Sequence, residues 1–183
     1  QVVPAAFIEN VSPTERINLS GKLRMLSQRV PSAACHLAAG IDVEGSRAIL
    51  SGAKNEFHDI LYALEFGSAD LNINGEETRK KTLMKVHELA THWQPYEGAV
   101  DSVLAGDTDA AQIKTLLNDS MTVLGSAKLL VSEISAQYSN PAEMTQSSAM
   151  VIDIAGRQRM LTQNMAKEAC AAWSCLSDSA PGD

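Results

Sequence analysis

The chain has 183 residues, of which 45% are hydrophobic and only 4% aromatic, and its formal net charge is −7. This length supports one domain with a substantial core, and the scarcity of aromatic residues favours packed helices over sheets. The negative charge argues against a nucleic-acid-binding protein, which needs a basic face.

The two ends of the chain differ in composition from the middle. The chain begins with Gln1 rather than Met, so we expect that an initiating segment was removed. Signal-peptide cleavage, the explanation we favour, implies export, and design of the expressed segment is the alternative. No apolar run reaches the roughly 18 residues of a membrane-spanning helix. We therefore predict an N-terminal arm at 1–12, one helical domain at 13–173 and a disordered Ser-, Pro- and Gly-containing tail at 174–183.

Hydrophobic periodicity and breakers predict five helices, at about 13–39, 43–66, 76–104, 109–138 and 141–173. Ser12, Pro13 and Glu15 form a capping-box pattern at the start of the first helix. Pro31 and Pro95 predict kinks, because proline removes a backbone donor inside a helix. Short connections make successive helices antiparallel. The predicted fold is thus an all-α, up-down antiparallel four-helix bundle plus a fifth helix, which runs parallel to the first.

The first and fifth predicted helices contain an internal repeat. Residues 17–29 align without gaps to residues 152–164, at an offset of 135, with six identities in 13 positions. The shared centre is Gly-x-x-Arg-Met-Leu, at Gly21–Leu26 and Gly156–Leu161. The same offset relates Cys35 to Cys170. Chance similarity of this extent within one short chain is improbable, so the repeat is the strongest functional signal in the sequence.

On a helix with about 100° per residue, Gly21 and Arg24 share a face, and Gln28 and Cys35 lie within about 40° of Arg24. A helix-interior glycine costs roughly 1 kcal/mol relative to alanine, and it allows close approach of a backbone or ligand. A guanidinium near the core needs an anionic partner. Parallel pairing of the two repeat helices would bring Arg24 and Arg159 together around a small planar oxyanion. The alternative is an ordinary helix contact whose arginines extend to solvent.

Three cysteines, Cys35, Cys170 and Cys175, allow one disulfide and one remaining thiol. Parallel pairing of the repeat helices brings Cys35 and Cys170 together, and in an oxidising compartment they could form a disulfide. A Cys35–Cys175 pair and three free thiols remain alternatives.

Residues 152–168, Ile-Asp-Ile-Ala-Gly-Arg-Gln-Arg-Met-Leu-Thr-Gln-Asn-Met-Ala-Lys-Glu, closely resemble the signature of PilJ-type domains. These are the N-terminal sensor domains of type IV pilus methyl-accepting chemotaxis transducers. Residues 17–29 resemble the same signature and the motif helix of NarX- and NarQ-type nitrate/nitrite sensor kinases. The resemblance covers about residues 13–170 and is strong only in the two motif helices.

The resemblance implies an extracytoplasmic, here periplasmic, four-helix bundle that senses a small anion such as nitrate or nitrite and signals to a membrane-bound sensor or transducer. In such sensors two first helices hold the ligand across a dimer interface through the motif glycine and arginine. In this chain the two copies could form the site within one chain or across a swapped homodimer. The resulting ligand-binding candidates are Gly21, Arg24, Gly156, Arg159, Gln28, Arg29 and Gln163. Asn164 stands where the second copy would repeat Arg29, so that position departs from the pattern.

No other constellation supports chemistry. His87 and His92 lie about 140° apart around a helix and do not form a metal-ligand pair. No pattern indicates an activated nucleophile, so we predict a non-enzymatic protein without metal or cofactor. The rival hypothesis is a structural or adaptor helical module that binds a protein partner and no small ligand.

Overall fold

The computed structural model describes residues 11–138 and 146–177, with side chains described for 13–138 and 154–173. Within these residues the fold is all-helical, as predicted. The helices are α2 (Val11–Ala38), α3 (Val43–Phe66), α4 (Lys80–Ala105), α5 (Ala110–Tyr138) and α6 (Gln146–Ser177). An isolated antiparallel bridge joins Ser68 to Ile73 in the connection between α3 and α4.

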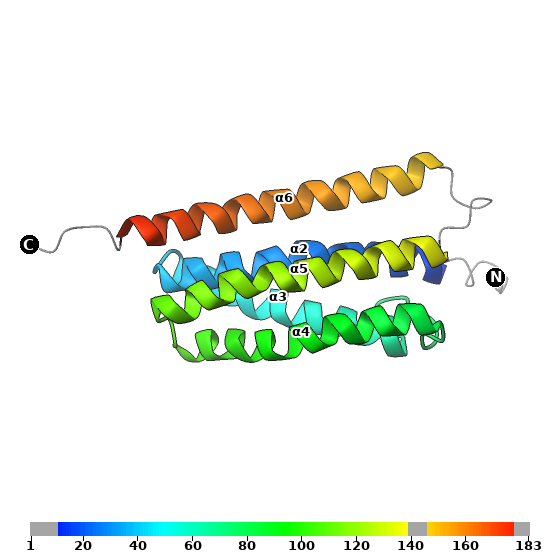
Figure 1. Cartoon of the computed structure of the whole chain (residues 1–183), viewed down its shortest axis with the longest axis horizontal. Coiled ribbons are helices and arrows are strands. Elements are labelled where there is room, and N and C mark those ends of the chain that lie inside the picture. The colour runs from blue at the N-terminus through cyan, green and yellow to red at the C-terminus, as the bar shows by residue number, and fades with distance from the viewer. Residues whose placement is uncertain (1–10, 139–145, 178–183) are drawn as a thin grey trace, which may run out of the picture.

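Helices α2 to α5 run up and down in an antiparallel bundle, and α6 returns along the outside, parallel to α2 (Figure 1). Helix α6 packs mainly against α2 and touches α5 only marginally, whereas α2 also packs on α3 and α5. Because three helices cover α2, it is buried on nearly every side, including all residues from Leu23 to Gln28. The predicted four-helix bundle with a fifth, parallel helix is therefore confirmed.

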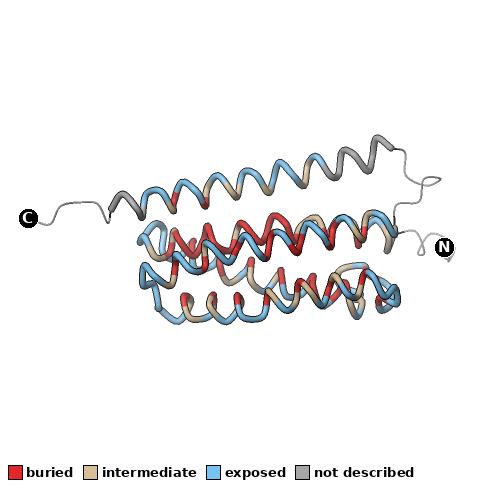
Figure 2. The backbone as a smooth tube through the Cα atoms, viewed as in Figure 1, coloured by how far each residue is buried: buried red, intermediate tan, exposed pale blue. Residues whose placement is uncertain are grey.

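The hydrophobic core lies between α2, α3, α4 and α5, and Cys170 is the one described α6 residue in it. The outer side of α6 is exposed along most of its described length (Figure 2). No helix among the described residues has an apolar stretch long enough to cross a membrane.

Helix boundaries differ from the predictions mainly at the ends. Helix α3 has the predicted limits, with Asp42 capping its start through a hydrogen bond from the Gly45 amide and with Gly67 after its end, at φ 83°. Helix α2 begins at Val11, so Ser12 lies inside the helix and not at its cap. Pro31 and Pro95 are accommodated within α2 and α4. Helix α6 continues to Ser177, so four residues of the predicted tail are helical, and 178–183 lie outside the described residues. The predicted start of this helix at Pro141 also falls outside them.

The start of α4 was predicted too early because Glu77 turns into the protein. Its backbone N–H donates to Glu65 O at 2.7 Å, and its carboxylate accepts from the Arg79 amide at 2.9 Å. The same carboxylate lies 3.6 Å from the buried Arg16 guanidinium and accepts a 2.6 Å hydrogen bond from Tyr138 Oη. These interactions join α2, the α3–α4 connection and α5 at one end of the bundle.

Candidate functional site

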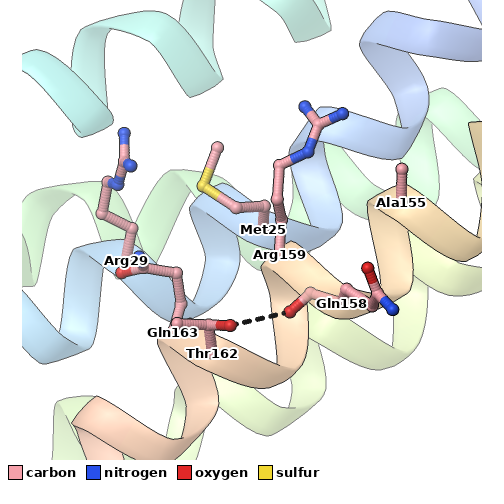
Figure 3. A pocket seen from close by; sticks show the side chains of 7 residues that line it. All are labelled: Met25, Arg29, Ala155, Gln158, Arg159, Thr162 and Gln163. Carbon is pink, nitrogen blue, oxygen red and sulfur yellow. Dashed lines mark hydrogen bonds between the residues drawn. The ribbon is translucent and has the colours of Figure 1, made fainter.

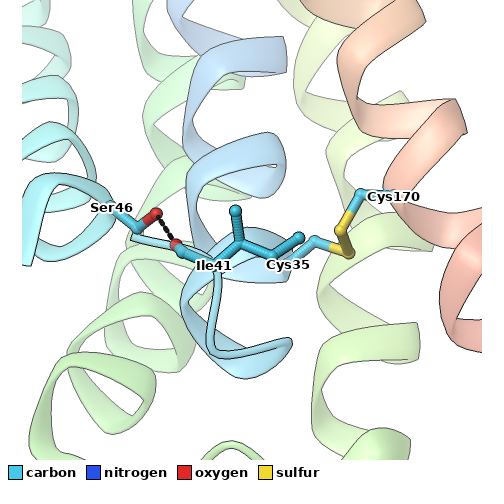
Figure 4. Close-up of a disulfide and its surroundings, with 4 residues drawn as sticks. All are labelled: Cys35, Ile41, Ser46 and Cys170. Atoms are coloured by element: carbon cyan, nitrogen blue, oxygen red, sulfur yellow. Dashed lines mark hydrogen bonds between the residues drawn. A yellow bond between two sulfur atoms is a disulfide. The ribbon is translucent and has the colours of Figure 1, made fainter. Parts of the chain in front are cut away.

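The two repeat helices lie side by side in the register that the repeat requires. A disulfide joins Cys35 of α2 to Cys170 of α6, with Cα atoms 6.2 Å apart (Figure 4). This separation is normal for a disulfide, so the helices need no distortion to form it. The predicted Cys35–Cys170 pair is confirmed, and it shows that the offset of 135 is a spatial register as well as a sequence register.

Arg24 occupies the space that the two motif glycines leave in the contact between α2 and α6. Only 8% of its surface is exposed. Its Nη2 atom lies 3.8 Å from the position of a Cβ on Gly21 and 3.0 Å from that of a Cβ on Gly156. The glycines therefore make room for a guanidinium between the helices. The sequence predicted that the motif glycines would allow a close approach. The structure has such an approach, and the group that comes close is the side chain of the motif arginine, Arg24.

Arg159, the repeat equivalent of Arg24, has a different environment. It is exposed, and no atom of Arg159 lies within 4 Å of a Cβ position on Gly21. The local twofold relation between the two copies therefore fails at the arginines. The reason is that α2 is enclosed by three helices, whereas α6 contacts the bundle on one side only.

Arg159 instead lines an open groove between the two repeat helices, of about 330 Å³. Helix α2 contributes Met25 and Arg29. Helix α6 contributes residues three or four positions apart on one face, namely Ala155, Gln158, Arg159, Thr162 and Gln163. The Arg29 and Arg159 side chains project to the same side, with Met25 between them (Figure 3). The α2 arginine that shares the groove with Arg159 is thus Arg29, because Arg24 is not among the lining residues.

The groove is positively charged and rich in hydrogen-bond donors. Its lining contains two guanidinium groups and two carboxamides, and none of its seven residues is acidic. The Thr162 hydroxyl donates to the Gln158 carbonyl of its own helix at 3.0 Å (Figure 3), so its proton is directed away from a ligand. Among the described residues, no group of three or more His, Cys, Asp or Glu side chains could hold a metal ion. The guanidinium and carboxamide N–H groups of this lining are donors of the kind that bind anionic groups.

A protein-family model matches residues 9–118, which is more than half of the chain; it describes the type IV pili methyl-accepting chemotaxis transducer N-terminal domain, PilJ. The chain belongs to the PilJ family. Among solved structures it is similar to the ligand-binding domain of the Pseudomonas aeruginosa nitrate receptor McpN, with 25% identity and a TM-score of 0.58. That similarity covers 68% of this chain and 97% of the other. A comparison with curated proteins found no match.

The PilJ match includes the first motif copy, on α2, and ends within α5. The second copy on α6 lies beyond the matched residues. This chain thus combines a PilJ sensor bundle with an additional helix that repeats the motif and lies on the first copy.

The structure distributes the predicted site residues over three environments. Arg29, Arg159 and Gln163 line the groove. Arg24 and the two motif glycines lie at the contact between the helices. Gln28 is fully buried, with its amide nitrogen 3.2 Å from Ser27 O, and it does not line the groove.

Two residues near the second motif copy were not predicted from the sequence. Gln158 lines the groove, and its three- and four-residue spacing from Ala155 and Thr162 could have revealed it. Lys167 is 3% exposed; its Nζ lies 3.0 Å from Glu168 Oε1 and 3.5 Å from Met121 Sδ of α5. Its burial depends on how α6 rests against α5, which no local sequence pattern encodes.

Proposed function

We propose that this chain is an extracytoplasmic, non-enzymatic sensor domain that binds a small oxyanion, such as nitrate or nitrite, in the α2–α6 groove and signals to a membrane-bound transducer. The observation that carries the proposal is the lining of the groove, where Arg29 and Arg159 from the two motif helices accompany Gln158 and Gln163 without an acidic residue.

The physical argument rests on charge and shape. Two guanidinium groups in one groove repel each other, and an anion between them converts this repulsion into two attractions. Guanidinium presents parallel N–H donors that match a planar oxyanion such as nitrate. The Gln158 and Gln163 carboxamides can supply further N–H donors. A bulky polyanion is less suitable, because the apolar part of the lining, at Met25 and Ala155, offers no side-chain donors.

Arg24 supports this site without lining it. Buried between the motif glycines, it fixes the spacing of α2 and α6 next to Met25, which lines the groove. An anion that draws Arg29 and Arg159 together acts on the same pair of helices. In this proposal the ligand changes the relative position of α2 and α6, and that change is the signal passed to the transducer.

The choice of nitrate as first probe follows from the comparison, because the similar P. aeruginosa domain belongs to a protein described as a nitrate receptor. Isothermal titration of the folded protein with nitrate, nitrite and chloride tests the proposal. We expect binding of at least one oxyanion and weaker binding of chloride, which cannot accept two parallel hydrogen bonds in one plane.

Arginine substitutions locate the site. Arg29→Ala and Arg159→Ala should each weaken binding tenfold or more, because a hydrogen bond to a charged group contributes about 1.5–3 kcal/mol. Arg157→Ala is the matched control, since Arg157 is exposed on the same helix and does not line the groove. Failure of a folded protein to bind any of these anions would overturn the proposal and favour an adaptor module that binds a protein partner. Equal weakening by Arg157→Ala would show that binding reflects general positive charge.

A further inference from the structure

Helix α6 carries a row of large apolar side chains on the side that faces away from the bundle. Ile154, Leu161 and Met165 are 47%, 53% and 71% exposed. Their seven- and four-residue spacings place them within about 20° of one direction on the helix. Ala172, also exposed, continues the row one heptad after Met165. We call these four residues the α6 stripe; Figure 2 shows the exposed outer side of this helix.

The internal repeat indicates what kind of surface this is. Through the offset of 135, Ile154, Leu161 and Met165 correspond to positions 19, 26 and 30 of α2. The α2 residues there are Leu19, Leu26 and Val30, which are 7%, 0% and 0% exposed. The α6 stripe is thus the equivalent of the face that α2 buries in the bundle core. Such a row of exposed apolar residues, on a helix whose other side is already packed, is typical of a protein-protein contact.

We propose that the α6 stripe is a homodimer interface, in which α6 of one chain packs antiparallel against α6 of a second copy. A twofold axis level with residue 163 places Leu161 against the partner's Met165 and Ile154 against the partner's Ala172. Both contacts then occur twice, as twofold symmetry requires. The small side chain of Ala172 opposite Ile154 keeps the packed layers similar in size, so the helices can approach closely.

Charge complementarity selects the second copy and the antiparallel direction. Arg157 and Glu168 lie on the same flank of the stripe, about 60° and 40° from its centre. In an antiparallel pair of helices, the same flank of each helix lies on the same side of the interface. Each Arg157 therefore meets the partner's Glu168. The twofold axis makes this contact occur twice, which gives two pairs of opposite charges. Parallel helices would bring each of these residues to the other flank, which carries Gln158 and Thr162.

The interface leaves the anion groove and the disulfide intact. Gly156 and Cys170 lie on the opposite side of α6, about 160° from the stripe, where they contact α2. The disulfide therefore holds the stripe outward. Dimerisation through it requires no rearrangement of the bundle, and it does not depend on whether the groove binds an anion.

Sedimentation velocity and light scattering of the disulfide-bonded chain test the inference. We expect the wild-type protein to be dimeric at tens of micromolar and Leu161→Glu to be monomeric. Leu129→Glu is the matched control, because Leu129 is a leucine of α5 with a similar exposure of 50%; this variant should remain dimeric. Circular dichroism confirms that each variant is folded, which is expected since both side chains lie at the surface.

A charge exchange tests the direction of the helices. Glu168→Arg should weaken the dimer at least several-fold by setting like charges together, and adding Arg157→Glu should restore it. A wild-type monomer at several hundred micromolar would overturn the inference. So would a dimer that Leu161→Glu leaves intact, because its interface must then lie elsewhere. Loss of the dimer in both Glu168→Arg and the double exchange would overturn the antiparallel arrangement.

Discussion

The guanidinium of Arg24 lies over Gly156, with its Nη2 atom 3.0 Å from the position that a Cβ on that residue would occupy. The glycine of one motif copy therefore accommodates the arginine of the other copy. The converse contact is absent among the described residues, since the side-chain atom that lies within 4 Å of a Cβ on Gly21 belongs to Arg24 of the same helix. Two similar sequence segments thus have different positions in one contact.

This asymmetry predicts opposite results for two equivalent substitutions. Replacing a helix-interior glycine with alanine stabilises a helix by about 1 kcal/mol when space allows. In Gly21→Ala the new Cβ meets Nη2 at an ordinary 3.8 Å, so the free energy of unfolding should rise by about that amount. In Gly156→Ala the 3.0 Å contact forces Arg24 to move, which should cancel the gain. Urea denaturation measures both.

Anion titration provides the second readout for this pair. Gly156→Ala should change anion affinity because it shifts Arg24, the sequence neighbour of the groove residue Met25, whereas Gly21→Ala should leave affinity unchanged. Equal stabilisation by the two substitutions, with equal affinities, would mean that the space above Gly156 has no functional importance.

The disulfide predicts how the protein responds to reduction. Cys170 is the only described α6 residue in the hydrophobic core, whereas α2 to α5 and Ile73 of the α3–α4 connection supply the rest of it. Loss of a native disulfide costs about 2–5 kcal/mol, and here α6, whose other described side chains lie outside the hydrophobic core, bears that cost. After reduction, or in Cys35→Ser/Cys170→Ser, α6 should separate while the bundle stays folded. Hydrogen exchange should accelerate by a hundredfold or more in α6 and change little in α3 and α4.

Limited proteolysis gives an independent check on the same event. The reduced protein should lose α6 to protease and yield a folded fragment that ends near the C-terminus of α5. Continued protection of α6 amides after complete reduction would show that Arg24, Lys167 and the other contacts hold this helix without the covalent bond.

The cluster at the other end of the bundle predicts a pH dependence. Burial and, second to it, the hydrogen bond to Glu77 raise the pKa of Tyr138 from 10 to about 12. The folded protein therefore retains this phenolic proton at pH values where the unfolded chain has lost it. The contribution to the free energy of unfolding is complete below about pH 10 and declines as the pH rises toward 12. In Tyr138→Phe this decline should be smaller, and the Tyr138 contribution to the phenolate absorbance near pH 12 should disappear.

Glu77→Gln separates the causes of that shift. Without the carboxylate charge the pKa of Tyr138 should move toward 10, although burial still keeps it elevated. The substitution also removes the acidic partner of Arg16, a buried guanidinium whose remaining acceptors are Leu64 O and Gly75 O, at 2.9 and 2.8 Å. Breaking a buried ion pair costs about 3–5 kcal/mol, so Glu77→Gln should be markedly less stable. An unchanged midpoint in urea would show that these carbonyl contacts suffice for Arg16.

Local chemistry alone determined most of the helices, the bundle and the pairing of the motif segments. Helix α3 has its predicted limits because the apolar spacing, the Asp42 cap and Gly67 all lie within or next to the segment that they define. The repeat also predicted the disulfide, because an offset shared by Gly, Arg and Cys positions specifies how two parallel helices align.

Only the tertiary structure decided how those helices rotate about their axes and what surrounds each equivalent residue. Arg24 is enclosed because α3, α5 and α6 all cover α2, whereas Arg159 is exposed because α6 packs on one side. The groove accordingly contains Arg29 instead of Arg24. At another place in the bundle, Glu77 is buried through contacts to Arg16 and Tyr138, which are more than 60 positions away in the sequence. A sequence pattern specifies which residues share a helix face, but the direction of that face depends on the packing free energy of the whole bundle.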